Sequence, residues 1–171
     1  MEIYNGKKYL EKIIKVFAEN NMIKSPKDFK NILLANKLHI NKNGDIVGWI
    51  IKGKEINFWS KDYLDVDEYA QLNQQEKKLS IYKFSYHFKP YNDKLDFFRI
   101  DNNNSKIHAH ASEKYFSEDH IYPEKLKLKI IFFNLLVGIF IVLKYIKNPD
   151  KYPLLEENAD MYNSIIEGGK Y

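Results

Sequence analysis

The sequence predicts an α+β fold: an antiparallel sheet packed by a long apolar C-terminal helix, with N-terminal helices. Apolar residues recur at helical spacing near both ends of the chain, whereas the middle of the chain alternates between apolar and polar residues with a period of two. The composition, with 44% hydrophobic and 15% aromatic residues in 171, is sufficient for one packed core.

Residues 1–40 are expected to form an N-terminal helical segment. Apolar side chains at helical spacing predict an amphipathic helix over residues 6–20. Ser25 is a suitable N-cap, and Pro26 after it suits the first helical position, so a second helix should begin there and reach about Asn36.

The main α+β domain is expected to span residues 41–147. Glycines separate short runs of residues with high β-propensity, which predicts strands at 38–40, 46–51 and 55–59. The polar stretch 61–78 is predicted to be a loop with room for one helical turn.

A three-stranded meander should follow. The stretch from Tyr82 to Lys89 alternates strictly between aromatic and polar residues, which is typical of a half-buried strand. The predicted continuation is a turn at 90–94, a strand at 95–101, a turn at 102–105 and a strand at 106–112.

The apolar faces of this meander fix a predicted register. Tyr86 should oppose Phe98 and Phe84 should oppose Ile100, while on the next pair of strands Ile100 should oppose Ile107 and Phe98 should oppose Ala109. The other face then carries three rows across the strands: His87, Phe97 and His110; Ser85, Arg99 and His108; Lys83, Asp101 and Lys106.

Two neighbour relationships follow from these rows. Arg99 and His108 should be directly opposed, with Cβ atoms about 4.5–5.5 Å apart. Asp101 should form ion pairs with Lys83 and Lys106.

A long helix is predicted to begin at Pro123 and to end near residue 147. Its central stretch, 130–143, is apolar apart from Asn134 and Gly138. This stretch is shorter than the roughly 20 residues that a membrane span needs, so we expect a core or interface helix, with membrane contact as the weaker alternative. Residues 148–171 should form a loosely held C-terminal tail with a short helix around 156–166.

The overall composition narrows the class of protein. There are no cysteines, which excludes a disulfide scaffold, a thiolate metal site and a cysteine nucleophile. No signal peptide is evident at the N-terminus, so we expect a cytoplasmic protein. The net charge of +4 suits an anionic partner without requiring one.

Arg99, the one arginine of this lysine-rich chain, marks the candidate site. Metal-free phosphodiester cleavage needs a base, an acid and a cation over the phosphate oxygens. His108 and His110 can fill the first two roles and Arg99 the third, with His87 as a further candidate catalytic histidine.

Two other interpretations of the same stretch remain open. His108 and His110 could bind a metal ion with Glu113, Asp119, His120 or His87, but a bare His-x-His is a weak motif, so we assign no metal ligands and no cofactor. Alternatively, the exposed aromatics and lysines around the cluster could form a binding surface for single-stranded nucleic acid, with no catalysis.

The motif Arg99-Ile100-Asp101-Asn102, followed by His108-Ala109-His110, resembles the TumE-type toxins of prokaryotic type II toxin–antitoxin pairs. The resemblance covers roughly residues 45–146. In the family pattern a tyrosine stands where this chain has Ile100, and the histidine stretch is longer. The resemblance implies a small cytoplasmic toxin that is neutralised by a cognate antitoxin protein and acts on RNA.

The sequence therefore predicts an RNA-directed nuclease whose catalytic residues are Arg99, His108, His110 and His87. Its predicted binding residues are Asp101, Asn102, Lys83 and Lys106. The alternative is a non-enzymatic protein that uses the apolar helix at 130–143 for homo-oligomerisation, for another partner or for membrane contact.

Overall fold

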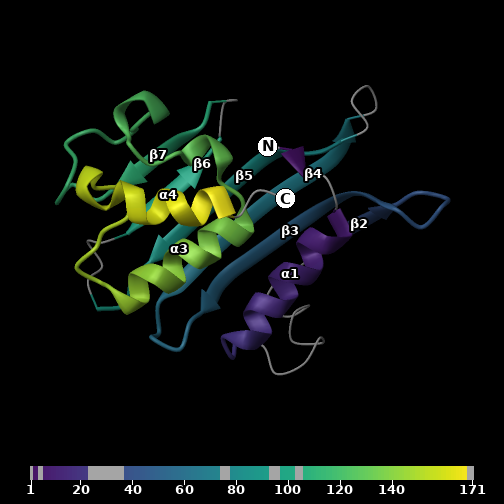
Figure 1. The fold of residues 1–171 in the computed structure, drawn as a ribbon, viewed down its shortest axis with the longest axis horizontal. Coiled ribbons are helices and arrows are strands. Elements are labelled where there is room, and N and C mark those ends of the chain that lie inside the picture. Colours follow the sequence, from purple (N-terminus) through teal and green to yellow (C-terminus); the bar gives the residue numbers. More distant parts are fainter. Residues whose placement is uncertain are drawn as a thin grey trace.

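One face of an antiparallel sheet is covered by helices, and the opposite face carries no helix among the described residues (Figure 1). The computed structural model describes residues 2–3, 6–22, 37–73, 78–92, 97–102 and 106–168. This architecture confirms the predicted α+β class. The predicted second helix, at 25–36, lies outside the described residues.

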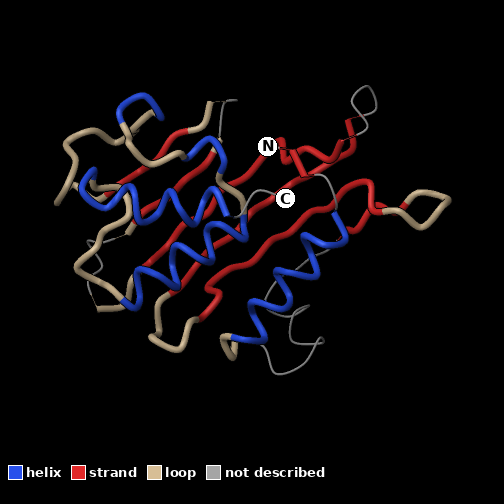
Figure 2. Tube along the Cα trace, viewed as in Figure 1, coloured by secondary structure: helices blue, strands red, loops and turns tan. Residues whose placement is uncertain are grey.

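The sheet order is β2-β3-β4-β5-β6-β7, and β1 pairs with β5. Figure 2 shows the strands as one layer behind the helices. The strands are β1 (Glu2–Ile3), β2 (Lys37–Ile40), β3 (Ile46–Asn57), β4 (Tyr63–Asn73), β5 (Lys78–Lys89), β6 (Phe98–Asp101) and β7 (His108–Ala111), and the helices are α1 (Gly6–Glu19), α3 (Leu135–Lys147) and α4 (Ala159–Gly168).

Helix α1 confirms the predicted N-terminal helix almost residue for residue. Tyr9, Ile13 and Phe17 recur every four residues along it, and all three are buried against the sheet and α3. The Tyr9 ring stacks on the indole of Trp49 in β3, with ring centroids 5.5 Å apart.

Strands β3 and β4 correct two predictions. Gly53 does not separate two strands, because β3 continues through it with a bulge between Gly53 and Ile56. The predicted loop at 61–78 is wrong: residues 63–73 form β4 in the middle of the sheet.

Glu68 explains why β4 is hard to recognise, since this carboxylate lies on the buried face of the strand. It is fully buried, and its oxygens accept four hydrogen bonds. The donors are the Tyr9 and Tyr86 hydroxyls, the Trp49 indole N–H and the Leu135 backbone N–H, at 2.6–3.0 Å. Burial raises the pKa of Glu68, against the lowering effect of these hydrogen bonds.

The predicted long apolar helix is wrong in length. Helix α3 begins only at Leu135 and has 13 residues, because Asn134 caps it by accepting a hydrogen bond from the Val137 N–H at 2.8 Å. The preceding segment, where the helix was expected to start, forms two short 3₁₀ helices at Pro123–Lys125 and Ile130–Phe132.

Nine of the 13 residues of α3 are buried within the chain itself, which accounts for their apolar character. Among the residues that the structure describes, no helix combines the length and the apolar character that crossing a membrane requires.

The C-terminal residues pack more firmly than expected. The predicted short helix is present as α4, but Tyr152, Leu154 and Tyr162 are buried, so the expectation of a loosely held tail is wrong. The Tyr152 hydroxyl also donates a 2.7 Å hydrogen bond to the carbonyl of Phe97, next to β6. This contact helps to fix the strand that carries Arg99.

Candidate functional site

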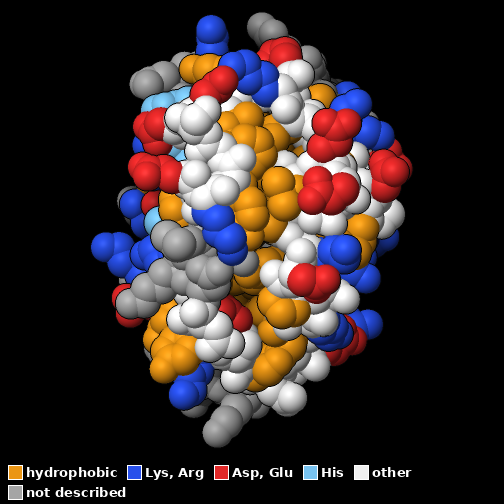
Figure 3. Space-filling view, turned by 90° about the vertical axis from the view of Figure 1, so that its left-hand side faces the viewer, with side chains coloured by type: hydrophobic (Ala, Val, Ile, Leu, Met, Phe, Trp, Pro, Cys, Tyr) orange, Lys and Arg blue, Asp and Glu red, His pale blue; other side chains and the backbone are white. Residues whose placement is uncertain are grey.

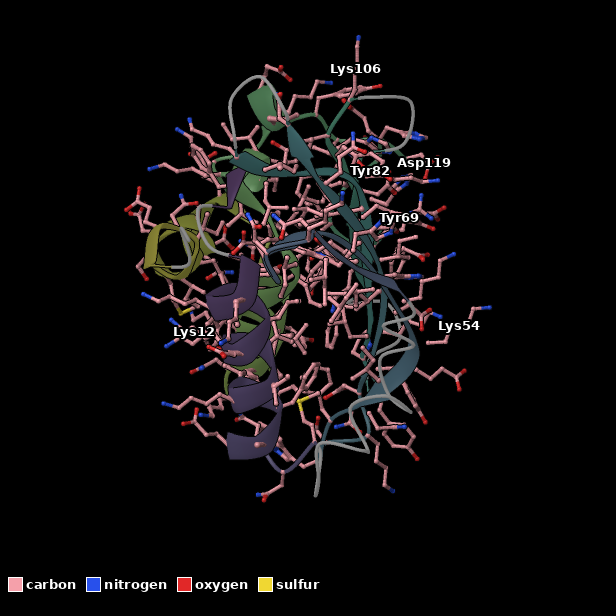
Figure 4. The ribbon with its side chains drawn as sticks, turned by 90° about the vertical axis from the view of Figure 1, so that its right-hand side faces the viewer. Lys12, Lys54, Tyr69, Tyr82, Lys106 and Asp119 are labelled. Atoms are coloured by element: carbon pink, nitrogen blue, oxygen red, sulfur yellow. The ribbon has the colours of Figure 1, made fainter. Side chains whose placement is uncertain are left out.

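The candidate site lies on the sheet face opposite the helices, which we call the open face. Figure 4 shows Lys54, Tyr69, Tyr82 and Asp119 on this side of the sheet, whereas Lys12 projects from α1 on the helical side. The side chains of β6 divide between the two sides by strand alternation: Phe98 and Ile100 enter the core, and Arg99 faces the open side.

The register of the meander differs from the prediction by two residues on each strand pair. Tyr86 opposes Ile100 instead of Phe98, and Ile100 opposes Ala109 instead of Ile107. A shift of two residues keeps every side chain on its predicted face, because side chains alternate with a period of two. The predicted histidines and Arg99 therefore do share the open face, but in different rows.

One row now contains His87, Arg99 and His110, and the next contains Ser85, Asp101 and His108. Arg99 is thus opposed by His110, and the predicted direct pair of Arg99 with His108 is wrong. The pair of β5 with β6 at the end of β5 is Phe88 with Phe98. These two rings pack with centroids 5.3 Å apart, which favours the observed register.

Asp101 is the buried centre of the site, with no solvent exposure. Its Oδ2 lies 2.8 Å from Nε of Arg99, and its Oδ1 lies 3.1 Å from Nε2 of His108. Ser85 and His108 oppose Asp101 in the sheet, so the predicted row of Lys83, Asp101 and Lys106 is wrong. Asp101 instead holds the cationic Arg99 beside the imidazoles.

His108 and His110 point their Nε2 atoms toward each other, 3.1 Å apart. Nδ1 of His108 lies 3.0 Å from the Lys106 carbonyl oxygen, and a carbonyl oxygen can only accept, so Nδ1 carries the proton of that hydrogen bond. Nδ1 of His110 lies 3.4 Å from Oδ1 of Asp119, which assigns its proton in the same way.

The segment after β7 brings a third histidine into the site. Ile121 forms an antiparallel bridge with Ala109, with two backbone hydrogen bonds of 2.8 and 2.9 Å. This bridge places the His120 ring 4.4 Å from the His110 ring and 4.9 Å from the His108 ring, measured between centroids. We call His108, His110 and His120 the histidine cluster; Figure 3 shows histidine side chains among acidic and basic side chains at one margin of the molecule.

Burial and the charge of Arg99 both act on the His110 imidazole. Burial lowers the pKa of His110, and the neighbouring Arg99 guanidinium lowers it further. The Arg99 Nη2 lies 2.5 Å from Nε2 of His110, where a neutral imidazole nitrogen can accept a hydrogen bond. The hydrogen bond from His110 in turn lowers the pKa of the exposed Asp119 carboxyl.

His87 lies in the row of Arg99 and His110. Its ring packs edge-on against Phe97, with centroids 6.0 Å apart. Burial lowers the pKa of His87 to about 4, so this imidazole stays neutral at physiological pH and cannot serve as a general acid there. It lines a hollow of about 360 Å³ on the open face, together with Lys52, Asp65 and Arg99.

An aromatic platform lies along the sheet from the histidine cluster. We call Tyr69 and Tyr82, with Lys52 and Lys83, the tyrosine platform. The two rings lie 6.2 Å apart, and the ammonium groups of the two lysines lie 5.4–5.5 Å from the Tyr69 ring centroid. Tyr82 is half exposed, and the predicted binding residue Lys83 belongs to this group.

Sequence reasoning placed Tyr82 on the apolar face, and this expectation is wrong. The β4–β5 pairing shifts between Tyr69, which opposes Lys83, and Ala70, which opposes Ile81. Tyr82 is therefore the extra residue of a bulge, and Figure 4 shows it on the open side. Tyr69 lies in the stretch predicted to be a loop, so no sequence pattern pointed to it.

The other predicted binding residues have structural contacts. The Asn102 side chain accepts from the Phe84 N–H at 2.7 Å and donates to the Tyr82 carbonyl at 2.8 Å. It therefore fixes the backbone of β5 around the bulge. Lys106 contributes its carbonyl oxygen to His108, as described above.

Comparisons with protein-family models, with curated proteins and with solved structures found no match to this chain. The resemblance to TumE-type toxins stays a prediction that depends on the residues of β6 and β7.

Proposed function

We propose that this protein is an RNA-directed nuclease that cleaves phosphodiester bonds at the histidine cluster. One observation carries the proposal: the imidazole Nε2 atoms of His108 and His110 lie 3.1 Å apart beside the Arg99 guanidinium, on a sheet face that no described helix covers. Proton-transfer groups and a planar cation in this arrangement suit a phosphate ester.

The tyrosine platform supports a single-stranded substrate. Aromatic rings that alternate with lysines bind bases by stacking and the backbone by charge, with little sequence preference. From the strand spacing, Tyr69 lies roughly 12 Å from Asp101, so one strand of RNA can contact the platform and the histidine cluster together.

The proposed cleavage reaction needs no reactant other than the RNA itself. The 2′-oxygen forms a bond to phosphorus while the bond between phosphorus and the 5′-oxygen breaks. One proton leaves the 2′-hydroxyl and one reaches the departing 5′-oxygen. The cluster imidazoles supply the base and the acid, and the Arg99 guanidinium stabilises the charge on the non-bridging oxygens.

The side chain of Arg99 is 36% exposed, so it can reach a phosphate without leaving Asp101. A guanidinium has several N–H donors in a fixed plane, and it can bind a carboxylate on one edge and a phosphate on another. This geometry supports Arg99 as the phosphate ligand of the site.

In the cell, we propose the role of a toxin in a toxin–antitoxin pair, acting in the cytoplasm where its RNA substrate lies. The motif match supports this role, and the open face offers a cognate antitoxin protein a surface on which to block the site. Expression from a tightly controlled promoter should arrest growth for the wild-type protein and not for the His108→Ala/His110→Ala variant.

The direct test uses purified, untagged protein with single-stranded RNA and with DNA of the same sequence. We expect cleavage of RNA only, because the proposed nucleophile is the 2′-hydroxyl. His108→Ala/His110→Ala should abolish cleavage, whereas His39→Ala, which changes an exposed histidine on β2, should not. Cleavage by the double variant at the wild-type rate would refute the assignment, provided that its circular dichroism spectrum is unchanged.

The alternative function depended on an apolar helix that needs a partner or a membrane to cover it. Because nine residues of α3 are buried in the chain's own core, its apolar character is explained without such a partner.

A further inference from the structure

We propose that His108, His110 and His120 form a binding site for one divalent transition-metal ion, with Zn²⁺ as the best match. Each histidine offers one ring nitrogen, and these three atoms all lie within 4.8 Å of one another. Imidazole nitrogen is a preferred ligand of Zn²⁺, and a site with three histidines is one of its established ligand sets in proteins.

The spacing of the two buried imidazoles fits a tetrahedral ion. Two nitrogens that each lie 2.0–2.1 Å from a tetrahedral Zn²⁺ are separated by about 3.3 Å. The Nε2 atoms of His108 and His110 lie 3.1 Å apart, without any rearrangement of β7. The two-residue spacing on a strand places both rings on one face, so the strand itself fixes this separation.

The contacts around the cluster orient the rings as metal ligands are usually oriented. A histidine ligand commonly donates its other ring N–H to a carbonyl or carboxylate oxygen. Nδ1 of His108 has the Lys106 carbonyl at 3.0 Å, and the Asp119 carboxylate lies 3.4 Å from Nδ1 of His110 and 3.2 Å from Nδ1 of His120. All three Nδ1 atoms thus have an acceptor, which leaves the facing Nε2 lone pairs of His108 and His110 to bind an ion.

Charge also favours a cation at this position. With their protons on Nδ1, His108 and His110 present two lone pairs to each other, and only a shared proton or a cation makes that approach favourable. The buried Asp101 carboxylate lies 3.1 Å from Nε2 of His108 and 3.7 Å from Nε2 of His110, and its negative charge is shared between this site and the Arg99 guanidinium, 2.8 Å from Oδ2. Nη2 of Arg99 donates a hydrogen bond to Nε2 of His110, so the Arg99 side chain has to move away from this nitrogen for the ion to bind there.

The site is open on one side, because the His120 side chain is 49% exposed whereas those of His108 and His110 are nearly buried. Three protein ligands leave one position of a tetrahedral ion for water, which is the arrangement of catalytic zinc sites. The ion-bound hydroxide would then take the proton of the 2′-hydroxyl, and the ion-bound water so formed would return a proton to the departing 5′-oxygen, because the three imidazoles would then serve as ligands. This role rests on the proposed nuclease function, whereas the binding of the ion does not.

The test measures metal binding without RNA. Untagged protein is treated with a chelator, dialysed and titrated with ZnCl₂ by isothermal calorimetry, and the bound metal per chain is measured by mass spectrometry. We expect one Zn²⁺ per chain. His120→Ala should weaken binding about 100-fold or more, and Asp119→Ala should weaken it about 10- to 100-fold.

Both of these variants change exposed side chains, so loss of binding cannot be ascribed to misfolding. His39→Ala is the matched control, because it removes a histidine outside the cluster and should bind Zn²⁺ as the wild type does. Absence of Zn²⁺ binding by the wild type, or equal binding by His120→Ala, would overturn the proposal.

An RNA assay then separates the two proposals. If the metal-free protein cleaves RNA at the wild-type rate and His108→Ala/His110→Ala does not, the nuclease function stands and a catalytic role of the ion is excluded. If one Zn²⁺ binds and no RNA is cleaved, the site is correct and the nuclease function fails.

Discussion

Oδ1 of Asp101 lies 3.1 Å from Nε2 of His108, and these two residues face each other directly across the β6–β7 pair. The carboxylate has no exposure to solvent, and its other oxygen lies 2.8 Å from Arg99. A buried charge of this kind must be compensated by its neighbours. Asp101 therefore affects the stability of the sheet and also positions Arg99 and His108 of the proposed site.

Removing this charge should destabilise the protein. Asp101→Asn leaves the Arg99 guanidinium without its anion, and the loss of one partner of a buried pair costs about 3 kcal/mol in free energy of unfolding. Urea unfolding followed by tryptophan fluorescence measures the change. Asp67→Asn, on the same row but half exposed, is the control and should change stability by less than about 0.5 kcal/mol. Equal effects of the two substitutions would contradict the prediction.

Tyr86→Phe should also lower stability, on the other side of the sheet. The substitution removes the hydroxyl that donates to Oε2 of Glu68 at 2.6 Å and leaves a fully buried carboxylate one donor short. The expected cost is about 1–3 kcal/mol in the same unfolding measurement. Tyr82→Phe removes a hydroxyl from an exposed ring and should have no measurable effect.

Asp65 should make stability depend on pH in the acid range. Burial alone would raise the pKa of Asp65, but the Glu55 N–H at 2.7 Å and the Lys89 ammonium lower it below the usual value. Its contribution is therefore present above the unfolded-state pKa and is lost as the pH falls through the lower folded-state pKa. Asp65→Asn should be less stable than the wild type by about 1 kcal/mol at pH 7.

The difference between the two proteins should shrink as the pH is lowered below about 4, where the wild-type carboxylate is protonated as well. Unfolding curves at several pH values measure this difference. A gap that is constant from pH 7 to pH 3 would show that the charge of Asp65 is not the cause.

Tyr82→Ala should weaken RNA binding. Loss of one stacking ring costs about 1–3 kcal/mol, which corresponds to a fall in affinity of at least about fivefold in fluorescence anisotropy with labelled single-stranded RNA. Tyr82→Phe keeps the ring and should bind as the wild type does. Lys12 lies on the helical side, so Lys12→Ala tests whether any loss of positive charge weakens RNA binding. If Lys12→Ala weakened binding as much as Tyr82→Ala, the result would argue against the tyrosine platform.

Arg99→Lys should separate cleavage from metal binding. Lysine retains a positive charge beside Asp101 but lacks the planar set of donors that the guanidinium offers to phosphate. We expect the cleavage rate to fall about 100-fold, with Zn²⁺ binding retained because Arg99 is not in the proposed ligand set. A parallel loss of both would place Arg99 in the metal site.

The sequence predicted which face the site residues share, but not their rows. Alternation along the strands forces Arg99, His108 and His110 to one side whatever the register, provided that it shifts by an even number of residues. The register itself depends on tertiary contacts around the paired strands. Just after β5, the Tyr91 N–H donates a 2.7 Å hydrogen bond to Asp62, and no local pattern reveals such a contact.

Strand β4 and the start of α3 were missed for a related reason. The alternation of β4 is broken by Glu68, whose charge is compensated by donors from four distant parts of the chain. Asn134 stands in an apolar stretch that reads as continuous helix, yet it is the N-cap. His120 reaches the cluster only through the bridge at Ile121, so its position depends on the folded structure.

The four donors to Glu68 also limit how far this chain can be shortened. They come from residue 9 at one end, from Trp49 and Tyr86 in the sheet, and from residue 135 at the start of α3. A fragment without α1 would expose the indole of Trp49 and would remove the Tyr9 hydroxyl that donates to Glu68. A fragment that ends before α3 would remove the Leu135 N–H, which is another donor to Glu68. The minimal unit for expression or for fusion to another protein therefore includes both flanking helices, although every residue of the proposed site lies between them.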